Sequence, residues 1–74
     1  MAHYSGITSD LASRKAEHER TKKNLRNWKV ANSGVPFVSR AAAQAWEDAQ
    51  PGEHYPGGAP AVGPWYGYSF DYDE

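Results

Sequence analysis

The stretch that decides the fold is a run of aromatic residues alternating with small or acidic ones, Trp65-Tyr66-Gly67-Tyr68-Ser69-Phe70-Asp71-Tyr72-Asp73-Glu74. Successive side chains of a β-strand point to opposite faces, so the pattern would place four aromatic rings on one face of a strand. No other segment shows a strand pattern that would pair with this one. We therefore predict a β-strand-like segment whose pairing partner belongs to another protein.

Composition limits what the remainder of the chain can build. The chain has 74 residues and no cysteine. A chain of this length forms one small domain and buries only about 60% of its unfolded surface. The lack of cysteine excludes disulfides and thiolate metal sites, and the scattered His3, His18 and His54 show no zinc-binding pattern. We expect no independent large core, no cofactor and no metal site.

The charged residues divide the chain into two halves of opposite sign. Residues 1–40 hold eight basic and three acidic residues, a net charge of +5, whereas residues 41–74 hold six acidic residues and no Lys or Arg, a net charge of −6. Such asymmetry indicates electrostatic partners. The basic residues that we predict to make such contacts are Arg14, Arg20, Lys22, Lys23 and Arg26. The alternative is a solvated helix surface, because these charges would be distributed around a helix.

Helix signals occupy the first two thirds of the chain. No Pro or Gly interrupts residues 10–32, Asp10 is an N-cap residue type, and Gly34 suits a helix C-terminus. Ser39 is an N-cap residue type for a second helix, which Pro51 would end. We therefore predict a mainly α fold. It comprises an N-terminal arm (residues 1–8), a helical hairpin (residues 9–50, helices about 10–32 and 40–50) and an extended C-terminal arm (residues 51–74).

The hairpin and the arm differ in their expected contributions to stability. Trp28 and Trp46 would meet in the small core of the hairpin. Residues 51–64 carry four of the five prolines, which favours an extended connector. The arm would bind a partner through its aromatic residues, so removing residues 64–74 should leave the helices intact. The predicted partner-binding residues are Trp65, Tyr66, Tyr68, Phe70 and Tyr72.

These features favour a structural function over catalysis. Ser, His and acidic residues fall into no recognisable catalytic arrangement along the sequence, so we expect no enzyme. The leading hypothesis is a non-enzymatic accessory subunit, present in multiple copies, that joins the protein subunits of a large assembly through its C-terminal arm. By analogy of architecture, a bacteriophage virion component (minor capsid, cement or connector protein) is the first expectation.

Two alternatives remain open. One is an accessory subunit of a cellular membrane or organellar complex, and the other is a small nucleic-acid-associated protein that uses the basic helix. No apolar run approaches the roughly 20 residues that span a bilayer, and no secretory signal is visible. We therefore expect no membrane insertion. The location would be the virion if the source is viral, and otherwise the soluble interior of a cell.

Overall fold

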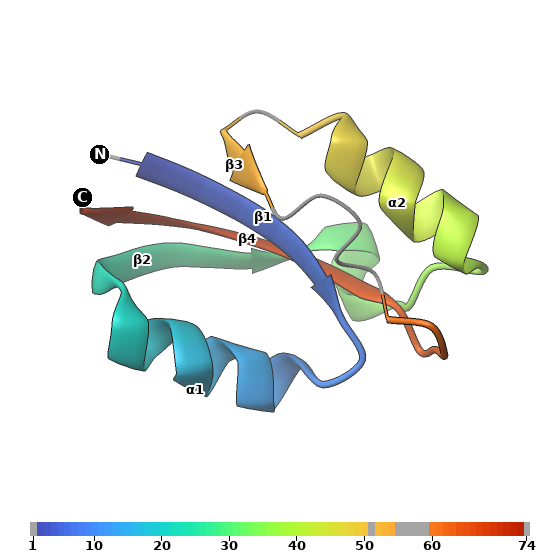
Figure 1. Cartoon of the computed structure of the whole chain (residues 1–74), viewed down its shortest axis with the longest axis horizontal. Helices are drawn as coiled ribbons and strands as arrows, with labels where there is room; N and C mark the ends of the chain where they lie inside the picture. Colours follow the sequence, from blue (N-terminus) through green and yellow to red (C-terminus); the bar gives the residue numbers. More distant parts are fainter. Residues whose placement is uncertain (1, 51, 55–59, 74) are drawn as a thin grey trace.

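A four-stranded sheet lies between two helices (Figure 1). The structure is a computed structural model that describes residues 2–50, 52–54 and 60–73. The elements in chain order are β1 (Ala2–Thr8), α1 (Leu11–Thr21), β2 (Lys23–Val30), the short 3₁₀ turn η1 (Ala31–Gly34), α2 (Arg40–Asp48), β3 (Glu53–His54) and β4 (Tyr66–Asp73). The strand order is β2-β4-β1-β3.

Strand β4 lies inside the sheet and pairs on both edges with its own chain. It is antiparallel to β1, from Ala2 opposite Tyr72 to Thr8 opposite Tyr66, and also antiparallel to β2. The two-residue β3 adds to the outer edge of β1 in the parallel direction. The predictions of a mainly α fold, an N-terminal arm and an extended C-terminal arm are therefore wrong. The chain combines two helices with three antiparallel strands.

The aromatic face of β4 forms the larger of two cores. Phe70 is 0% exposed, Tyr68 is 2% exposed and Tyr72 is also buried. Side chains from β1, α1 and β2 pack against these rings: Ala2, Tyr4, Leu11, Leu25 and Trp28. The predicted strand alternation is therefore real, but its aromatic rings are buried inside this chain.

The predicted helix over residues 10–32 is wrong beyond its first half. Asp10 does cap α1, since its side chain accepts a hydrogen bond from the backbone N–H of Ser13. The helix ends at Thr21, however, and Lys22 already has an extended backbone conformation. The chain then continues as β2.

Strand β2 advances three residues for every two residues of β4. Lys23 lies opposite Asp73, Arg26 opposite Asp71 and Lys29 opposite Ser69, with an irregularity in each interval. Asn24 and Asn27 supply these two irregularities, with φ values of 57° and 56°. Asparagine tolerates this left-handed conformation better than most residues.

The face of β4 opposite the aromatic rings carries a polar network near the chain ends. Asn24 donates a hydrogen bond to Asp73 at 3.0 Å, and Asn27 donates one to Asp71 at 2.8 Å. Arg26 lies 3.0 Å from Asp73, and His3 Nδ1 lies 2.8 Å from Asp71 Oδ1. The network thus joins β1, β4 and β2 across the sheet.

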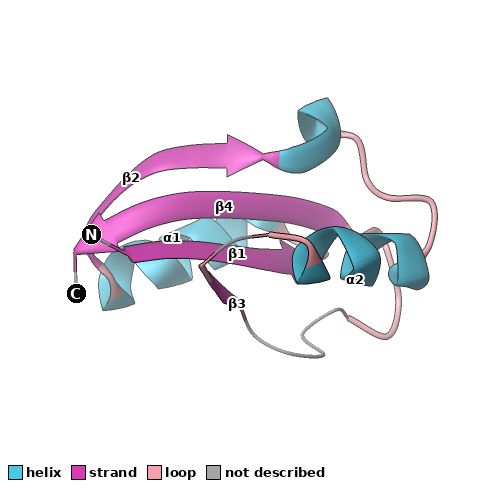
Figure 2. Cartoon of the chain, turned by 90° about the horizontal axis from the view of Figure 1, so that it is seen from above, coloured by secondary structure: helices cyan, strands magenta, loops and turns pink. Residues whose placement is uncertain are grey.

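The smaller core lies under α2, the helix labelled in Figure 2, at the other end of the same face. It is built on Ile7 and Ala43, with Phe37, Trp46 and Trp65 packed around them. A Cβ atom on Gly67 would lie 2.7 Å from the Trp46 ring, so glycine lets α2 approach β4. Trp28 stacks on Tyr68 over the opposite face. The two tryptophans therefore belong to separate cores, and the predicted hairpin core is wrong.

Deleting residues 64–74 should now unfold the chain, the reverse of the expectation from sequence. The deletion removes the strand to which both β1 and β2 are hydrogen-bonded. We expect the loss of any cooperative thermal transition in circular dichroism. Phe70→Ala is the milder test and should cost about 3–5 kcal/mol, whereas Val62→Ala, at a 77% exposed position, should cost little. A truncated chain that melts cooperatively at the wild-type temperature would contradict this topology.

The polar network should make the fold sensitive to acid. The hydrogen bond from His3, followed by that from Asn27, lowers the pKa of Asp71 below its usual value of 3.8. A lowered folded-state pKa adds stability that is fully present above the unfolded pKa and is lost as pH falls through the folded pKa. We expect thermal stability to fall below about pH 4. Asp71→Asn should be less stable than wild type at pH 7 and should lose less on acidification; equal pH dependence of the two proteins would rule this out.

Candidate functional site

Three polar aromatic side chains from three elements meet on the α1 face of the sheet. His18 Nε2 of α1 lies 2.8 Å from the Tyr68 hydroxyl of β4. The Tyr4 ring of β1 lies 4.9 Å from the His18 ring and 6.3 Å from the Tyr68 ring. We call Tyr4, His18 and Tyr68 the tyrosine–histidine cluster. Tyr4 and His18 are half-buried, so the cluster lies at the border between the core and solvent.

The sheet register creates the space for this cluster. Gly6 of β1 lies directly opposite Tyr68, and a Cβ atom at Gly6 would fall 2.5 Å from the Tyr68 hydroxyl oxygen. Trp28 stacks on the Tyr68 ring at 4.9 Å with an interplanar angle of 15°. Glycine in β1 and tryptophan in β2 therefore fix the position of the Tyr68 phenol.

Burial holds both hydrogen-bonding partners in their neutral forms. Burial, followed by the positive charges of Lys22 and Arg14, lowers the pKa of His18. Burial, followed by the proximity of Tyr4, raises the pKa of Tyr68, and the charge of Glu47 raises it further. At neutral pH, an uncharged imidazole thus contacts a protonated phenol. When Nε2 carries no proton, it accepts a hydrogen bond from the Tyr68 hydroxyl.

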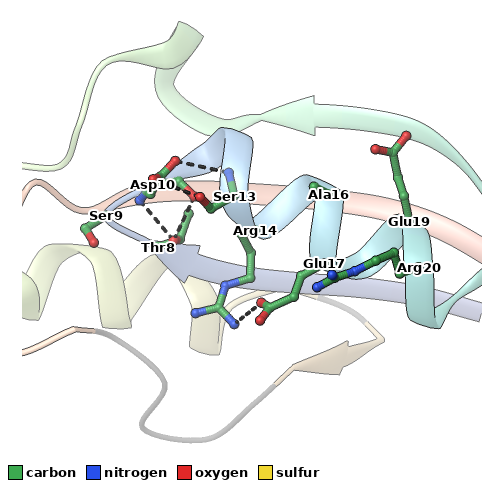
Figure 3. Close-up of a pocket in the computed structure, with 9 residues that line it drawn as sticks. All are labelled: Thr8, Ser9, Asp10, Ser13, Arg14, Ala16, Glu17, Glu19 and Arg20. Atoms are coloured by element: carbon green, nitrogen blue, oxygen red, sulfur yellow. Dashed lines mark hydrogen bonds and ion pairs between the residues drawn. The ribbon is translucent and has the colours of Figure 1, made fainter.

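Charged residues lie beside the cluster on α1, and one charged residue is buried on α2 across the sheet. Arg14 lies one helical turn before His18, and its guanidinium is 2.9 Å from the Glu17 carboxylate. Figure 3 shows both side chains projecting from the same side of α1. They line an open groove of about 690 Å³ together with Thr8, Ser13 and Arg20. Glu47 of α2 is fully buried and accepts a hydrogen bond from Gln44 at 2.9 Å.

The predicted partner-binding aromatic residues have mostly internal positions. Tyr68, Phe70 and Tyr72 lie in the larger core, where contact with another protein would require β4 to leave its sheet. Trp65 is half-buried and donates a hydrogen bond to the Pro60 carbonyl at 2.8 Å. Tyr66 is also half-buried. Their role in partner binding stays a prediction.

The five basic residues predicted to make electrostatic contacts do not form one surface. Arg14 and Lys22 flank the tyrosine–histidine cluster on α1 and at its end. Arg26 belongs to the polar network on the opposite face, and Lys23 lies across from Asp73. Arg20 is exposed in the groove along α1.

Sequence reasoning missed Tyr4 and His18 as members of a site. Ala2–Thr8 alternates in a strand-like way just before the Asp10 cap, and that alternation was the one available signal for β1. Even so, the meeting of Gly6 with Tyr68 depends on a register between the two ends of the chain. No local sequence motif indicates this contact.

Comparison with known proteins finds no family model, no curated protein and no solved structure that matches this chain. Across the residues that the structure describes, neither helix combines the length and apolar character needed to cross a membrane. Within the same residues, no three His, Cys, Asp or Glu side chains gather in a metal-binding arrangement.

Gly6→Ala should disrupt the cluster more than it disrupts the fold. The new methyl group would displace the Tyr68 hydroxyl and admit water to His18. Because burial is the main cause of the lowered His18 pKa, that pKa should rise toward its usual value of 6.5. An NMR titration of the His18 ring protons measures this shift. A wild-type titration curve in the folded variant would contradict the described packing.

Proposed function

We propose that this chain is a small nucleic-acid-associated protein that hydrolyses phosphodiester bonds at the tyrosine–histidine cluster. The single observation that carries the proposal is the 2.8 Å contact between a neutral imidazole and a buried phenol, next to Arg14. The expectation that the chain is not an enzyme rested on the order of residues along the sequence. Folding assembles groups that are separated by up to 64 positions, from Tyr4 to Tyr68.

The charges around the cluster favour a phosphate-containing substrate. The guanidinium of Arg14 can form two parallel hydrogen bonds to phosphate oxygens, and Lys22 supplies a second positive charge close by. Lys and Arg side chains also provide the salt-dependent attraction that holds nucleic acids without regard to sequence. A polymeric phosphodiester therefore suits this surface better than a neutral substrate.

The cluster can move the protons that hydrolysis requires. Neutral His18 can act as general base toward a water molecule through the Tyr68 hydroxyl, which passes its own proton to Nε2 as it accepts one from the water. As the new water–phosphorus bond forms, the ester P–O bond breaks, and the resulting imidazolium returns a proton to the leaving oxygen. Arg14 would stabilise the negative charge on the phosphoryl oxygens. The charge of Glu17 would stabilise the imidazolium, because it favours the charged form of His18.

An assembly role is the second candidate, and a different observation favours it. Val38, Val62 and Val35 are 93%, 77% and 58% exposed, and Val35 and Val38 flank Phe37, which pairs with Trp65. An accessory subunit of a virion or of another large assembly could use these valines for protein contacts. Replacing them with serine should then reduce copurification with that assembly without changing the melting temperature.

Tyr68→Phe separates catalysis from packing. It removes one hydroxyl oxygen and keeps the ring that stacks on Trp28. We expect cleavage of a labelled oligonucleotide to fall about 100-fold or more, the lower end of the usual contribution of proton transfer. Cleavage should be measured in Mg²⁺ and in EDTA, by gel electrophoresis.

Tyr72→Phe is the matched control, since Tyr72 lies on the same face of β4 and is also buried. This variant should keep near-wild-type activity. If wild-type protein cleaves neither DNA nor RNA under either condition, hydrolysis is not its function. If both variants lose activity equally, the effect comes from β4 packing and the catalytic role of Tyr68 is wrong.

A further inference from the structure

We infer that Lys22 is a substrate-positioning residue that binds a phosphate of a nucleic-acid strand next to the cleaved bond, while Arg14 binds the phosphate that is cleaved. The inference rests on the proposed function and extends it. It names the substrate as a strand several nucleotides long.

Two positively charged residues lie before and after His18 along the chain. Arg14 lies one turn before His18 on α1, on the same side of the helix. Lys22 follows the last residue of α1, and its backbone N–H still donates to the His18 carbonyl at 2.8 Å. Both positive charges lower the pKa of His18, so both act on the cluster.

Aromatic rings hold the Lys22 ammonium group beside the cluster. Its Nζ lies 5.6 Å from the centroid of the Tyr4 ring and 5.2 Å from that of the Tyr72 ring. Cation–π contacts of this kind orient the side chain without neutralising its charge. Among the residues that the structure describes, Lys22 forms no ion pair, whereas Arg14 and Arg26 each contact a carboxylate. Its charge therefore remains available to an anion.

A contact between Lys22 and a neighbouring phosphate would favour a long substrate. A nucleic-acid strand carries a phosphate on each nucleotide, so it can offer Lys22 a second phosphate next to the one that water attacks. A small phosphodiester carries only the phosphate that is cleaved.

Lys22→Gln tests this with two substrates, a single-stranded 12-mer oligonucleotide and bis(p-nitrophenyl) phosphate. For the oligonucleotide, we expect about tenfold weaker binding and a dependence of log K on log salt that is shallower by about one. For the small diester, kcat/KM should be unchanged. Lys22→Arg should restore oligonucleotide binding. Lys29→Gln is the control, since Lys29 is exposed on β2 opposite Ser69, away from the aromatic face, and its loss should have a smaller effect.

Each outcome decides the inference. Equal losses in Lys22→Gln and Lys29→Gln would overturn it, and so would a parallel loss on both substrates, which indicates damage to the cluster. Failure of wild-type protein to bind the oligonucleotide would also overturn it. If wild-type protein binds the oligonucleotide through Lys22 but hydrolyses neither substrate, strand binding is supported and the proposed hydrolysis fails. If Lys22→Gln does not fold, the same comparisons apply to Lys22→Met, which keeps the apolar stem against the rings.

Discussion

The pairing of β4 between β1 and β2 is the constraint on which the rest of the structure depends. It joins the two ends of the chain, from Ala2 opposite Tyr72 onward, so nearly the whole chain lies within the loop that it closes. Closing such a loop costs conformational entropy before the long-range contacts compensate for it. The compensation comes from both faces of the strand. Phe70 and its neighbours fill the larger core, and Gly67 admits Trp46 to the smaller one.

The irregular pairing of β2 with β4 also supports packing on the aromatic face of β4. A regular strand would alternate its side chains residue by residue, whereas β2 places Leu25 and Trp28, three residues apart, against the aromatic face. The asparagines in the left-handed conformation make this spacing workable, and their side chains bind Asp71 and Asp73. Irregular pairing and exposed basic residues also make β2 a poor template for edge-to-edge association. The network therefore stabilises the sheet and protects its edge.

The three-residue spacing in β2 explains why its sequence predicts a helix, whereas the sequence of β4 predicts a strand correctly. The two-residue alternation of β4 is regular, and the prediction of a strand there was sound. Leu25, Trp28 and Ala31 follow one another every three residues, which imitates the apolar stripe of a helix and extended the predicted helix over β2. Strand β1 carries small and polar residues at most positions, so its alternation gives a weak signal. Because the sequence predicts neither β1 nor β2 as a strand, it offers β4 no partner within the chain. The prediction that its aromatic rings bind another protein follows from that. The tyrosine–histidine cluster could not be predicted either, because Gly6, His18 and Tyr68 come together only through the sheet register.

The composition of the cluster bears on why it exists. A folded chain of 74 residues is only marginally stable, and burying a polar group costs free energy unless the group is hydrogen-bonded. Phenylalanine at Tyr68 and leucine at His18 would fill similar space without that cost. The chain instead buries a phenol against an imidazole and fully buries the Glu47 carboxylate. Neighbouring charges and burial that keep an imidazole neutral are the arrangement that proton-transfer sites use. Packing alone does not require these residues, which favours a function at this cluster over one at the other surfaces of the described residues.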